Sequence, residues 1–188
     1  MTQTFPRIAP VEPPFAPTMA AVLAKWMPPG AAVPPLALFR TLARHPMLIE
    51  RKRPLGSGLL AHGSLPPRVR ELLILRTSAR CNARYEWGVH AAAFANMVGI
   101  DATAVGNTAT TSPEALTARD DDDALVLRVA DELHDSSALS DALFQAVRTR
   151  WGEEALLEMA AVVGFYHLIA FVLGTARVQD EPWAVPFP

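Results

Sequence analysis

The chain has 188 residues, of which 51% are hydrophobic and 19% are charged, and its formal net charge is -2. This length suits one domain, or two small halves that share a core. Because no basic tract interleaves with aromatic residues, the sequence argues against a nucleic-acid partner. The one cysteine, Cys81, excludes a disulfide within the chain and a four-cysteine metal site.

Charge and hydropathy also predict how the protein assembles and where in the cell it is found. The charged fraction is below the usual quarter, so we expect another copy of the chain to cover some apolar surface in a homo-oligomer. The first fifteen residues lack the cationic and apolar regions of a secretory signal. The apolar stretch 160–174 is shorter than the roughly 20 residues of a membrane span and favours a buried helix. We therefore expect a cytoplasmic protein without a membrane partner.

The first third of the chain predicts a proline-rich arm and three helices. Five prolines lie within residues 1–17, which favours an extended N-terminal arm. The helices are expected over 18–27, over 36–45, and from Pro46 to about Leu60, with Pro28-Pro29-Gly30 ending the first. The basic cluster of residues 51–53 in the third helix is typical of a solvated face.

Residues 64–99 predict two helices joined by a tight break. The run Ser64-Leu65-Pro66-Pro67 is typical of a helix start, with the serine as a cap. The following RVRELLILRTSAR has a broad apolar face, and its length and proline start favour a helix over a buried strand. A break at Cys81-Asn82 precedes a second helix over 83–98, which ends at Gly99.

The second half repeats this plan after a connecting segment. Small and polar residues over 100–120 predict a connecting segment, marked by Gly106, Asn107, Ser112 and Pro113. The acidic run 120–123 is typical of a helix N-terminus, where carboxylates cap free amides, rather than of a metal site. A helix over 140–149, a break at Trp151-Gly152 and a long helix over 153–173 then mirror the helix-turn-long-helix unit of 66–98. No segment alternates with period two, so we expect one all-α domain over 1–188.

Three side chains of residues 64–99 form a candidate site. Glu86 and His90 are four residues apart and share one helix face, and the preceding helix can bring Glu71 onto that face. A carboxylate beside an imidazole orients the ring and raises its basicity, as acid–base catalysis near neutral pH requires. Tyr85 and Trp87 are candidates for walls that exclude water. The alternative is a plain surface ion pair between Glu86 and His90.

Metal binding has weaker support in the sequence. Glu86 and His90 would need a third ligand, and no His-x-x-x-His pair exists. The histidines outside this group share no ligand spacing; they are His45, His62, His134 and His167. His167 lies in an apolar helix and is expected to be a hydrogen-bonded core histidine, with a pocket formed by Tyr166 and His167 as the alternative. We expect no metal and no cofactor.

The run from Leu65 to Gly99, with LPPRVRELLILR at its start and YEWGVH at its centre, resembles the carboxymuconolactone decarboxylase family. That superfamily also contains the AhpD-like alkylhydroperoxidases. The resemblance extends to the segments near 35–40 and 164–173. It implies an AhpD-like helical bundle that assembles into trimers or hexamers.

The resemblance also implies roles for particular residues. AhpD-like members use a Glu, a Cys-x-x-Cys pair and a His, of which Glu71 and His90 are present here. The cysteine positions fall on Ala83 and Glu86, so disulfide-based peroxide reduction is not implied. What remains resembles a cofactor-free decarboxylation of a small unsaturated acid or lactone. His90 would donate the proton, and Glu86 or Glu71 would orient it.

The remaining partners of this reaction are less specified. A cation is expected for the substrate carboxylate, and Arg76 and Arg84 are the candidates nearby.

Two other functions stay open. In one, Cys81 alone is the peroxidatic thiol of a redox enzyme. In the other, the chain is a non-catalytic helical module that binds a small molecule or a partner.

Overall fold

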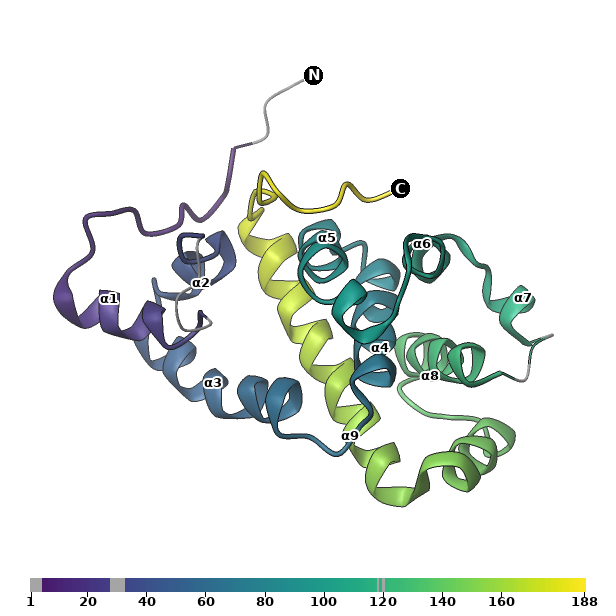
Figure 1. The fold of residues 1–188 in the computed structure, drawn as a ribbon. Helices are drawn as coiled ribbons and strands as arrows, with labels where there is room; N and C mark the ends of the chain where they lie inside the picture. Colours follow the sequence, from purple (N-terminus) through teal and green to yellow (C-terminus); the bar gives the residue numbers. More distant parts are fainter. Residues whose placement is uncertain (1–4, 28–32, 118, 120) are drawn as a thin grey trace.

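The computed structural model describes residues 5–27, 33–117, 119 and 121–188, and within them every regular element is a helix (Figure 1). The helices in chain order are α1 (Pro17–Ala24), α2 (Ala37–Leu42), α3 (Pro46–Ala61), α4 (Pro67–Arg80), α5 (Arg84–Ala93), the 3-10 helix η1 (Ala95–Val98), α6 (Ala102–Thr110), α7 (Pro113–Thr117), α8 (Asp122–Ser136) and α9 (Asp141–Ala176). The all-α prediction is confirmed. The proline and glycine residues expected to end the first helix lie outside the described residues.

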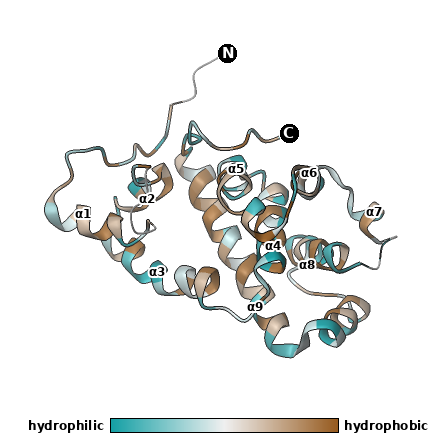
Figure 2. Ribbon diagram, viewed as in Figure 1, coloured by the Kyte–Doolittle hydropathy of each residue, from teal (hydrophilic) through white to brown (hydrophobic). Residues whose placement is uncertain are grey.

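Helix α4 lies at the centre of the molecule. It packs against α5, α6, α8 and α9, and residues 72–75 are all buried, so this stretch of the helix has no solvent face. A helix that is apolar around its whole circumference is stable only when other helices cover every side. Figure 2 shows the same apolar character along the second half of α9. Side chains on α4 and α9 are therefore held by the core itself.

The break between α4 and α5 is confirmed and has a local cause. Asn82 has a positive φ of 52°, a left-handed conformation that asparagine tolerates better than most residues. The chain therefore reverses over a few residues and sets α5 beside α4. The predicted serine cap is wrong, because Ser64 does not cap α4. Its backbone N–H and hydroxyl both donate to Glu158 instead.

The connecting segment contains two helices, which were not predicted from the sequence. Asp101 accepts a hydrogen bond from the Ala104 N–H and starts α6, and Pro113 begins α7. The buried side chains of α6 are small, which lets the helix pack closely on α4. Tertiary packing stabilises this helix despite a composition that by itself is typical of a loop.

The acidic run starts α8 as expected. Asp121 is the N-cap, and its carboxylate accepts a hydrogen bond of 3.0 Å from the Ala124 N–H. Asp122 and Asp123 lie in the first turn, where negative charge complements the helix dipole. Asp120 lies outside the described residues. The side-chain cap explains the run without a metal.

Helix α9 contains the predicted break. Gly152 has a φ of 84° and a ψ of 176°, which interrupts the helical backbone between its two parts. Two helix-break-helix units are therefore present, but they differ in proportion. The first unit consists of α4 with 14 residues and α5 with 10, so its second helix is the shorter one, and the second unit ends in the long part of α9.

Helix α9 separates two groups of helices in Figure 1, with α1–α3 on one side and α4–α8 on the other. Among the described residues, α9 is the one helix that is long and apolar enough to cross a membrane, and core helices of soluble proteins share these properties. Thirteen of its residues are buried against the rest of the chain, among them Val163 and Tyr166. A core helix explains its composition, and the cytoplasmic location stays a prediction.

Backbone hydrogen bonds connect both terminal segments of the described chain to the helices. The backbone N–H groups of Arg7 and Ile8 donate to the carbonyl of Ala176, so the arm runs along the end of α9. The Val185 N–H donates to the carbonyl of Gly88 at 3.1 Å. A Cβ atom at Gly88 would lie 2.4 Å from the Val185 carbonyl oxygen, so only glycine permits this approach.

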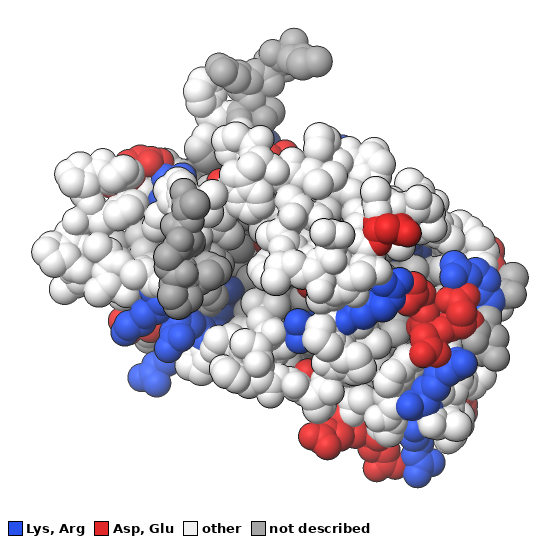
Figure 3. Space-filling model, in the orientation of Figure 1, with Lys and Arg blue, Asp and Glu red and all other residues white. Residues whose placement is uncertain are grey.

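Charged side chains are unevenly distributed on the face shown in Figure 3. Acidic and basic side chains interleave over the helices on the right, whereas basic side chains gather over α3 at the lower left. The upper part of this face carries few charges. The basic group at α3 adjoins the cavity described next.

Candidate functional site

A cavity of about 530 Å³ lies where α2 and α3 face α5 and α9. Its walls are mostly apolar and aromatic, and they include Trp26, Phe39 and Phe165. The polar and charged side chains that line it include Lys25, Lys52, Arg53, Ser57, Glu86, His90 and Tyr166. An apolar cavity with a few convergent polar groups is the usual form of a small-molecule site.

The structure brings together the three residues that the sequence singled out. The Nδ1 atom of His90 lies 2.7 Å from Glu71 Oε1, and its Nε2 atom lies 3.5 Å from Glu86 Oε1. All three are buried, with 3% exposure for His90 and 2% for Glu71. Glu86 and His90 line the cavity, whereas Glu71 lies behind the imidazole on α4. Glu71 therefore orients the ring, and the Nε2 side of the ring faces the cavity.

These two carboxylates determine the charge of the imidazole. Burial by itself disfavours the imidazolium, but the adjacent Glu71 and Glu86 favour it more, and together they raise the pKa of His90 to about 10. At neutral pH both ring nitrogens therefore carry hydrogen. Nδ1–H donates to Glu71, and Nε2–H lies at the cavity wall, with Glu86 and the Tyr166 hydroxyl as its nearest partners.

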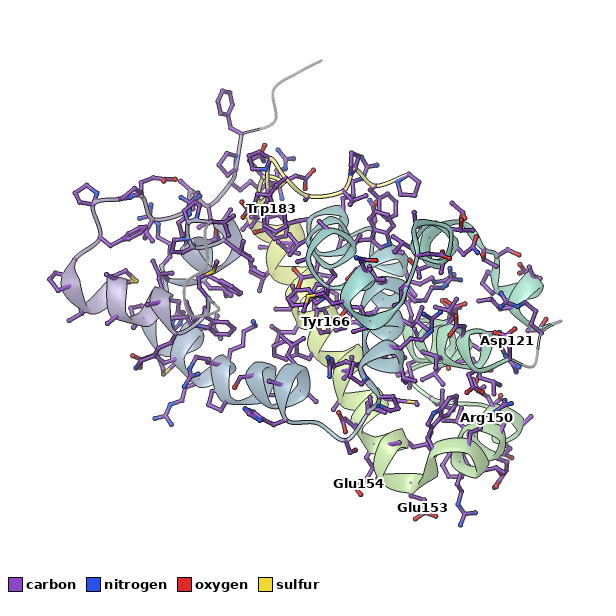
Figure 4. The ribbon with its side chains drawn as sticks, in the orientation of Figure 1. Asp121, Arg150, Glu153, Glu154, Tyr166 and Trp183 are labelled. Atoms are coloured by element: carbon purple, nitrogen blue, oxygen red, sulfur yellow. The ribbon has the colours of Figure 1, made fainter. Side chains whose placement is uncertain are left out.

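Tyr166 is a fourth member of this group that the sequence did not separate from its neighbour His167. It lies on α9 at the centre of the molecule (Figure 4), and its hydroxyl oxygen is 3.3 Å from His90 Nε2. Burial, followed by the charges of Glu86 and Glu71, raises the pKa of Tyr166 well above its usual value. The phenol is therefore neutral. Because its oxygen accepts from the imidazolium, its own hydrogen is free to donate to a ligand.

Lys52 supplies a positive charge inside the cavity. The basic cluster of residues 51–53 was expected to be a solvated face, but Lys52 is 8% exposed, and that expectation is wrong for it. Its ammonium nitrogen lies 4.5 Å from the ring centroid of Trp26 and 4.6 Å from that of Phe165. Burial lowers the pKa of Lys52 to about 8, against the opposing charge of Glu86. The ammonium group is thus charged at neutral pH and partly stripped of water.

A signal for Lys52 was present in the sequence. Ile49, Lys52, Gly56 and Leu59 recur at helical spacing, and these positions form the buried face of α3. Reading the three basic residues as one cluster obscured this period. The aromatic residues beside Lys52 come from other segments, and no local pattern joins them to it.

The two expected wall residues lie elsewhere. The Tyr85 hydroxyl donates to Glu181 at 2.6 Å and accepts from the Leu38 N–H. Trp87 Nε1–H donates to the Thr108 hydroxyl at 2.9 Å. Neither belongs to the described residues that line the cavity. They point from α5 into other parts of the core, because residues 85 and 87 lie on different sides of the helix from residues 86 and 90.

The two expected substrate cations also lie outside the cavity. Arg76 is buried and forms a two-point ion pair with Asp131, with Nε–Oδ1 at 2.7 Å and Nη2–Oδ2 at 2.8 Å. Arg84 is exposed, and its guanidinium carbon lies 5.8 Å from the ring centroid of Phe187. Helical spacing agrees with this, because Arg76 lies five residues after Glu71 and Arg84 lies two residues before Glu86, on other sides of their helices. Among the described residues, the cations that line the cavity are Lys25, Lys52 and Arg53.

Cys81 is remote from this group of side chains. No cysteine is among the described residues that line the cavity, and the positions of the family's cysteine pair hold Ala83 and Glu86. Cys81 follows the last residue of α4 and lies with His134 and His167, none of which lines the cavity. Burial also raises the pKa of its thiol, despite the nearby Arg80. The cavity therefore offers acid–base groups and no thiol.

Comparisons with known proteins concern one segment of the sequence and the fold. Residues 51–112 match the model of the carboxymuconolactone decarboxylase family. A crystal structure of an AhpD core, an uncharacterized peroxidase-related protein from Ralstonia eutropha JMP134, superposes with a TM-score of 0.77 at 19% identity over 96% of this chain and 95% of that one. A peroxidase-related protein from Silicibacter sp. TM1040 gives 0.78 at 15% identity over the full length of both.

A third likeness is to the debrominase Bmp8, solved in complex with 2,3,4-tribromopyrrole. It gives a TM-score of 0.69 at 17% identity over 96% of this chain and 94% of that one. No curated protein matches the sequence. At these identities the solved structures establish the fold alone. The chain has the AhpD-like all-helical fold, and its residues 51–112 match the model of the carboxymuconolactone decarboxylase family.

Proposed function

We propose that this protein is a cofactor-free lyase that decarboxylates a small unsaturated carboxylic acid or carboxy-lactone. The observation that carries the proposal is the placement of His90, hydrogen-bonded to Glu71, at the wall of an apolar cavity that also contains the buried side chain of Lys52. Such a cavity fits a small, partly apolar anion, and its charged groups are those that proton transfer requires.

The reaction balances with these groups alone. The substrate carboxylate would lie near Lys52, with its unsaturated body against the aromatic walls. Cleavage of the carbon–carbon bond releases carbon dioxide and leaves an electron pair delocalised into the adjacent unsaturated carbonyl system. Tyr166 would donate a hydrogen bond to the developing oxyanion. His90 Nε2–H would transfer its proton to carbon, and the neutral ring would then recover a proton from solvent.

An imidazolium with a pKa of about 10 is a weak acid, yet it suits this step. The electron pair left by decarboxylation is strongly basic, so proton transfer to it remains favourable. Glu86 approaches the same nitrogen at 3.5 Å and would stabilise the charged ring between turnovers. A thiol is not needed at any point.

The direct test is carbon dioxide release. The purified chain would be incubated with 4-carboxymuconolactone and a panel of β,γ-unsaturated carboxylic acids, without added metal or cofactor. We expect release from at least one of them, at the same rate for Cys81→Ser. Absence of release from the whole panel would contradict the proposal. Consumption of hydrogen peroxide that is lost in Cys81→Ser would support the thiol-based alternative.

The charge of Lys52 predicts the pH dependence of substrate capture. Both Lys52 and His90 must be protonated, so kcat/KM should be lost as pH rises through the lower of their pKa values, which is about 8 for Lys52. Above that pH we expect kcat/KM to fall about tenfold per pH unit. The measurement is a pH profile of kcat/KM between pH 6 and 10 on the active substrate.

A matched variant separates Lys52 from His90. Lys52→Arg keeps a positive charge at every pH in this range, so its alkaline fall should move from about 8 toward about 10, where His90 loses its proton. Lys52→Met should raise KM more than it lowers kcat. A wild-type profile that stays flat through pH 8 to 9 would show that this ammonium group does not hold the substrate.

Assembly into a homo-oligomer remains part of the proposal. Large apolar side chains are exposed on the described surface, among them Met97, Leu157 and Phe171. Their exposure agrees with the low charged fraction of the chain. Light scattering on the purified protein would give the subunit number, for which the family resemblance implies three or six.

A further inference from the structure

We propose that Cys81, His134 and His167 form a zinc site that is separate from the cavity. The three side chains come from the C-terminal end of α4, the last turn of α8 and the part of α9 that follows its break at Gly152. Their ligand atoms lie within 4.8 Å of one another. Neither the family match nor the solved structures assign a role to these residues, and the decarboxylation proposed above does not use them.

The separations between the ligand atoms are close to those of a zinc site. His134 Nδ1 lies 3.0 Å from His167 Nε2 and 3.8 Å from Cys81 Sγ. Zinc binds sulfur at about 2.3 Å and imidazole nitrogen at about 2.0–2.1 Å, so a tetrahedral site separates two nitrogens by roughly 3.3 Å and nitrogen from sulfur by roughly 3.6 Å. These two separations match a tetrahedral site to within a few tenths of an ångström, and the third, between Cys81 Sγ and His167 Nε2, is no longer than 4.8 Å.

A hydrogen bond already orients one ligand for metal binding. His167 Nδ1–H donates to the carbonyl of Val163 at 2.8 Å. In a neutral imidazole the Nε2 atom then carries the lone pair, and this atom is the one directed at His134. Histidine ligands of metals commonly make this second hydrogen bond, which fixes the ring and its tautomer. The expectation that His167 is a hydrogen-bonded histidine of α9 and a role as ligand are therefore compatible.

Proton and charge balance are also satisfied. Binding of the ion replaces the thiol proton of Cys81, which leaves to solvent, and moves the shared hydrogen of His134 from Nδ1 to Nε2. The nearby Arg80 would oppose a cation, but it is paired with Asp135 at 2.5 Å and approaches Asp131 at 3.6 Å. One thiolate and two neutral imidazoles are ligand types that zinc prefers.

The site is accessible and distinct from the cavity. All three residues are half-buried, so an ion can enter and a water molecule can complete a fourth position. Tyr166 and His167 are adjacent on α9 but serve different groups, since Tyr166 contacts His90 and His167 contacts His134. An ion here would join α4, α8 and α9 and stabilise the fold without touching the cavity.

Sequence spacing could not reveal this site. Cys81 and His134 are 53 residues apart, and His134 and His167 are 33 apart. The prediction that no metal binds rested on the lack of closely spaced ligands. That argument covers sites within one segment, whereas these ligands meet only after three helices pack.

The test is zinc retention by the full-length chain. The protein would be stripped with a chelator, incubated with Zn²⁺, desalted and analysed by mass spectrometry of its metal content. We expect about one zinc per chain for the wild type. Cys81→Ser and His167→Gln should each weaken zinc affinity more than about 100-fold, because residues that merely orient a ligand already contribute about 10–100-fold.

Controls keep the outcome decisive. His62→Gln removes an exposed histidine at the end of α3 and should retain zinc like the wild type. Added Zn²⁺ should raise the melting temperature of the wild type and not that of Cys81→Ser. With Co²⁺ in place of zinc, a thiolate-to-cobalt absorption band should appear and be absent in Cys81→Ser. A wild-type chain that retains no zinc, or a folded Cys81→Ser that retains as much, would overturn the proposal.

Discussion

Replacement of His90 by asparagine is expected to lower kcat for decarboxylation by about 100-fold to 10,000-fold, the usual contribution of a general acid. The asparagine amide can still donate to Glu71, which lies 2.7 Å from the Nδ1 position. It offers no acidic proton at the place of Nε2, where the substrate carbon would be protonated. Steady-state kinetics at pH 7, with circular dichroism to verify folding, measure this effect. A folded His90→Asn variant with wild-type kcat would refute the mechanism.

Glu71→Gln is the companion variant, because Glu71 acts through the imidazole. A glutamine oxygen can accept from Nδ1–H, but it lacks the charge that, together with Glu86, raises the pKa of His90. The pKa of His90 should therefore fall, and in a Lys52→Arg background the loss of activity should begin at lower pH than in Lys52→Arg alone. Combined with Lys52→Arg, this shift is visible without overlap from Lys52. If kcat falls but the alkaline limb does not move, Glu71 has only a structural role.

Asp131→Ala is expected to lower the free energy of unfolding by about 3–5 kcal/mol, because it leaves the buried charge of Arg76 without its partner. Arg76 is 2% exposed, and its remaining contacts are the carbonyls of Thr108 and Thr111 at 3.0 and 2.9 Å. Neither carbonyl carries a compensating charge. Urea-induced unfolding, followed by circular dichroism, gives the difference in free energy.

Two comparisons test the cause of this loss. Asp123→Ala removes a carboxylate from a partly exposed pair with Arg68, where solvent screens the charges, so we expect a loss within about 1 kcal/mol. The double variant Arg76→Met/Asp131→Leu removes both buried charges and should recover most of the stability of the wild type. If Asp131→Ala costs no more than Asp123→Ala, the buried pair does not stabilise the junction of α4 with α8.

Much of the helical organisation could be predicted from local sequence. Pro46 and Pro67 occupy the first turns of α3 and α4, where the missing N–H costs nothing. Asp121 caps α8, and Gly152 interrupts α9 at the expected place. These signals act within a few residues of chain, so no knowledge of the fold is needed to interpret them. The helices within 100–120 could not be predicted from local sequence, because α6 depends on contact with α4.

The candidate site could be predicted only in part. Glu86 and His90 share a face because of their spacing on one helix, and the short turn at Asn82 is enough to bring Glu71 to the same ring. The same spacing argues against Arg76 and Arg84, which lie on other sides of their helices from Glu71 and Glu86. In the structure Arg76 is paired with Asp131, and Arg84 is exposed.

By itself, then, the sequence determined the helix starts and breaks and the local pairing of Glu86 with His90, because backbone geometry and side-chain spacing along one helix are local properties. Only the tertiary structure decided that Lys52 is buried beside this pair, that Tyr166 and His167 serve different groups, and that Cys81 meets two histidines. Those neighbours come from helices remote in the chain. Their contacts arise from packing around α4 and α9, which no short stretch of sequence encodes.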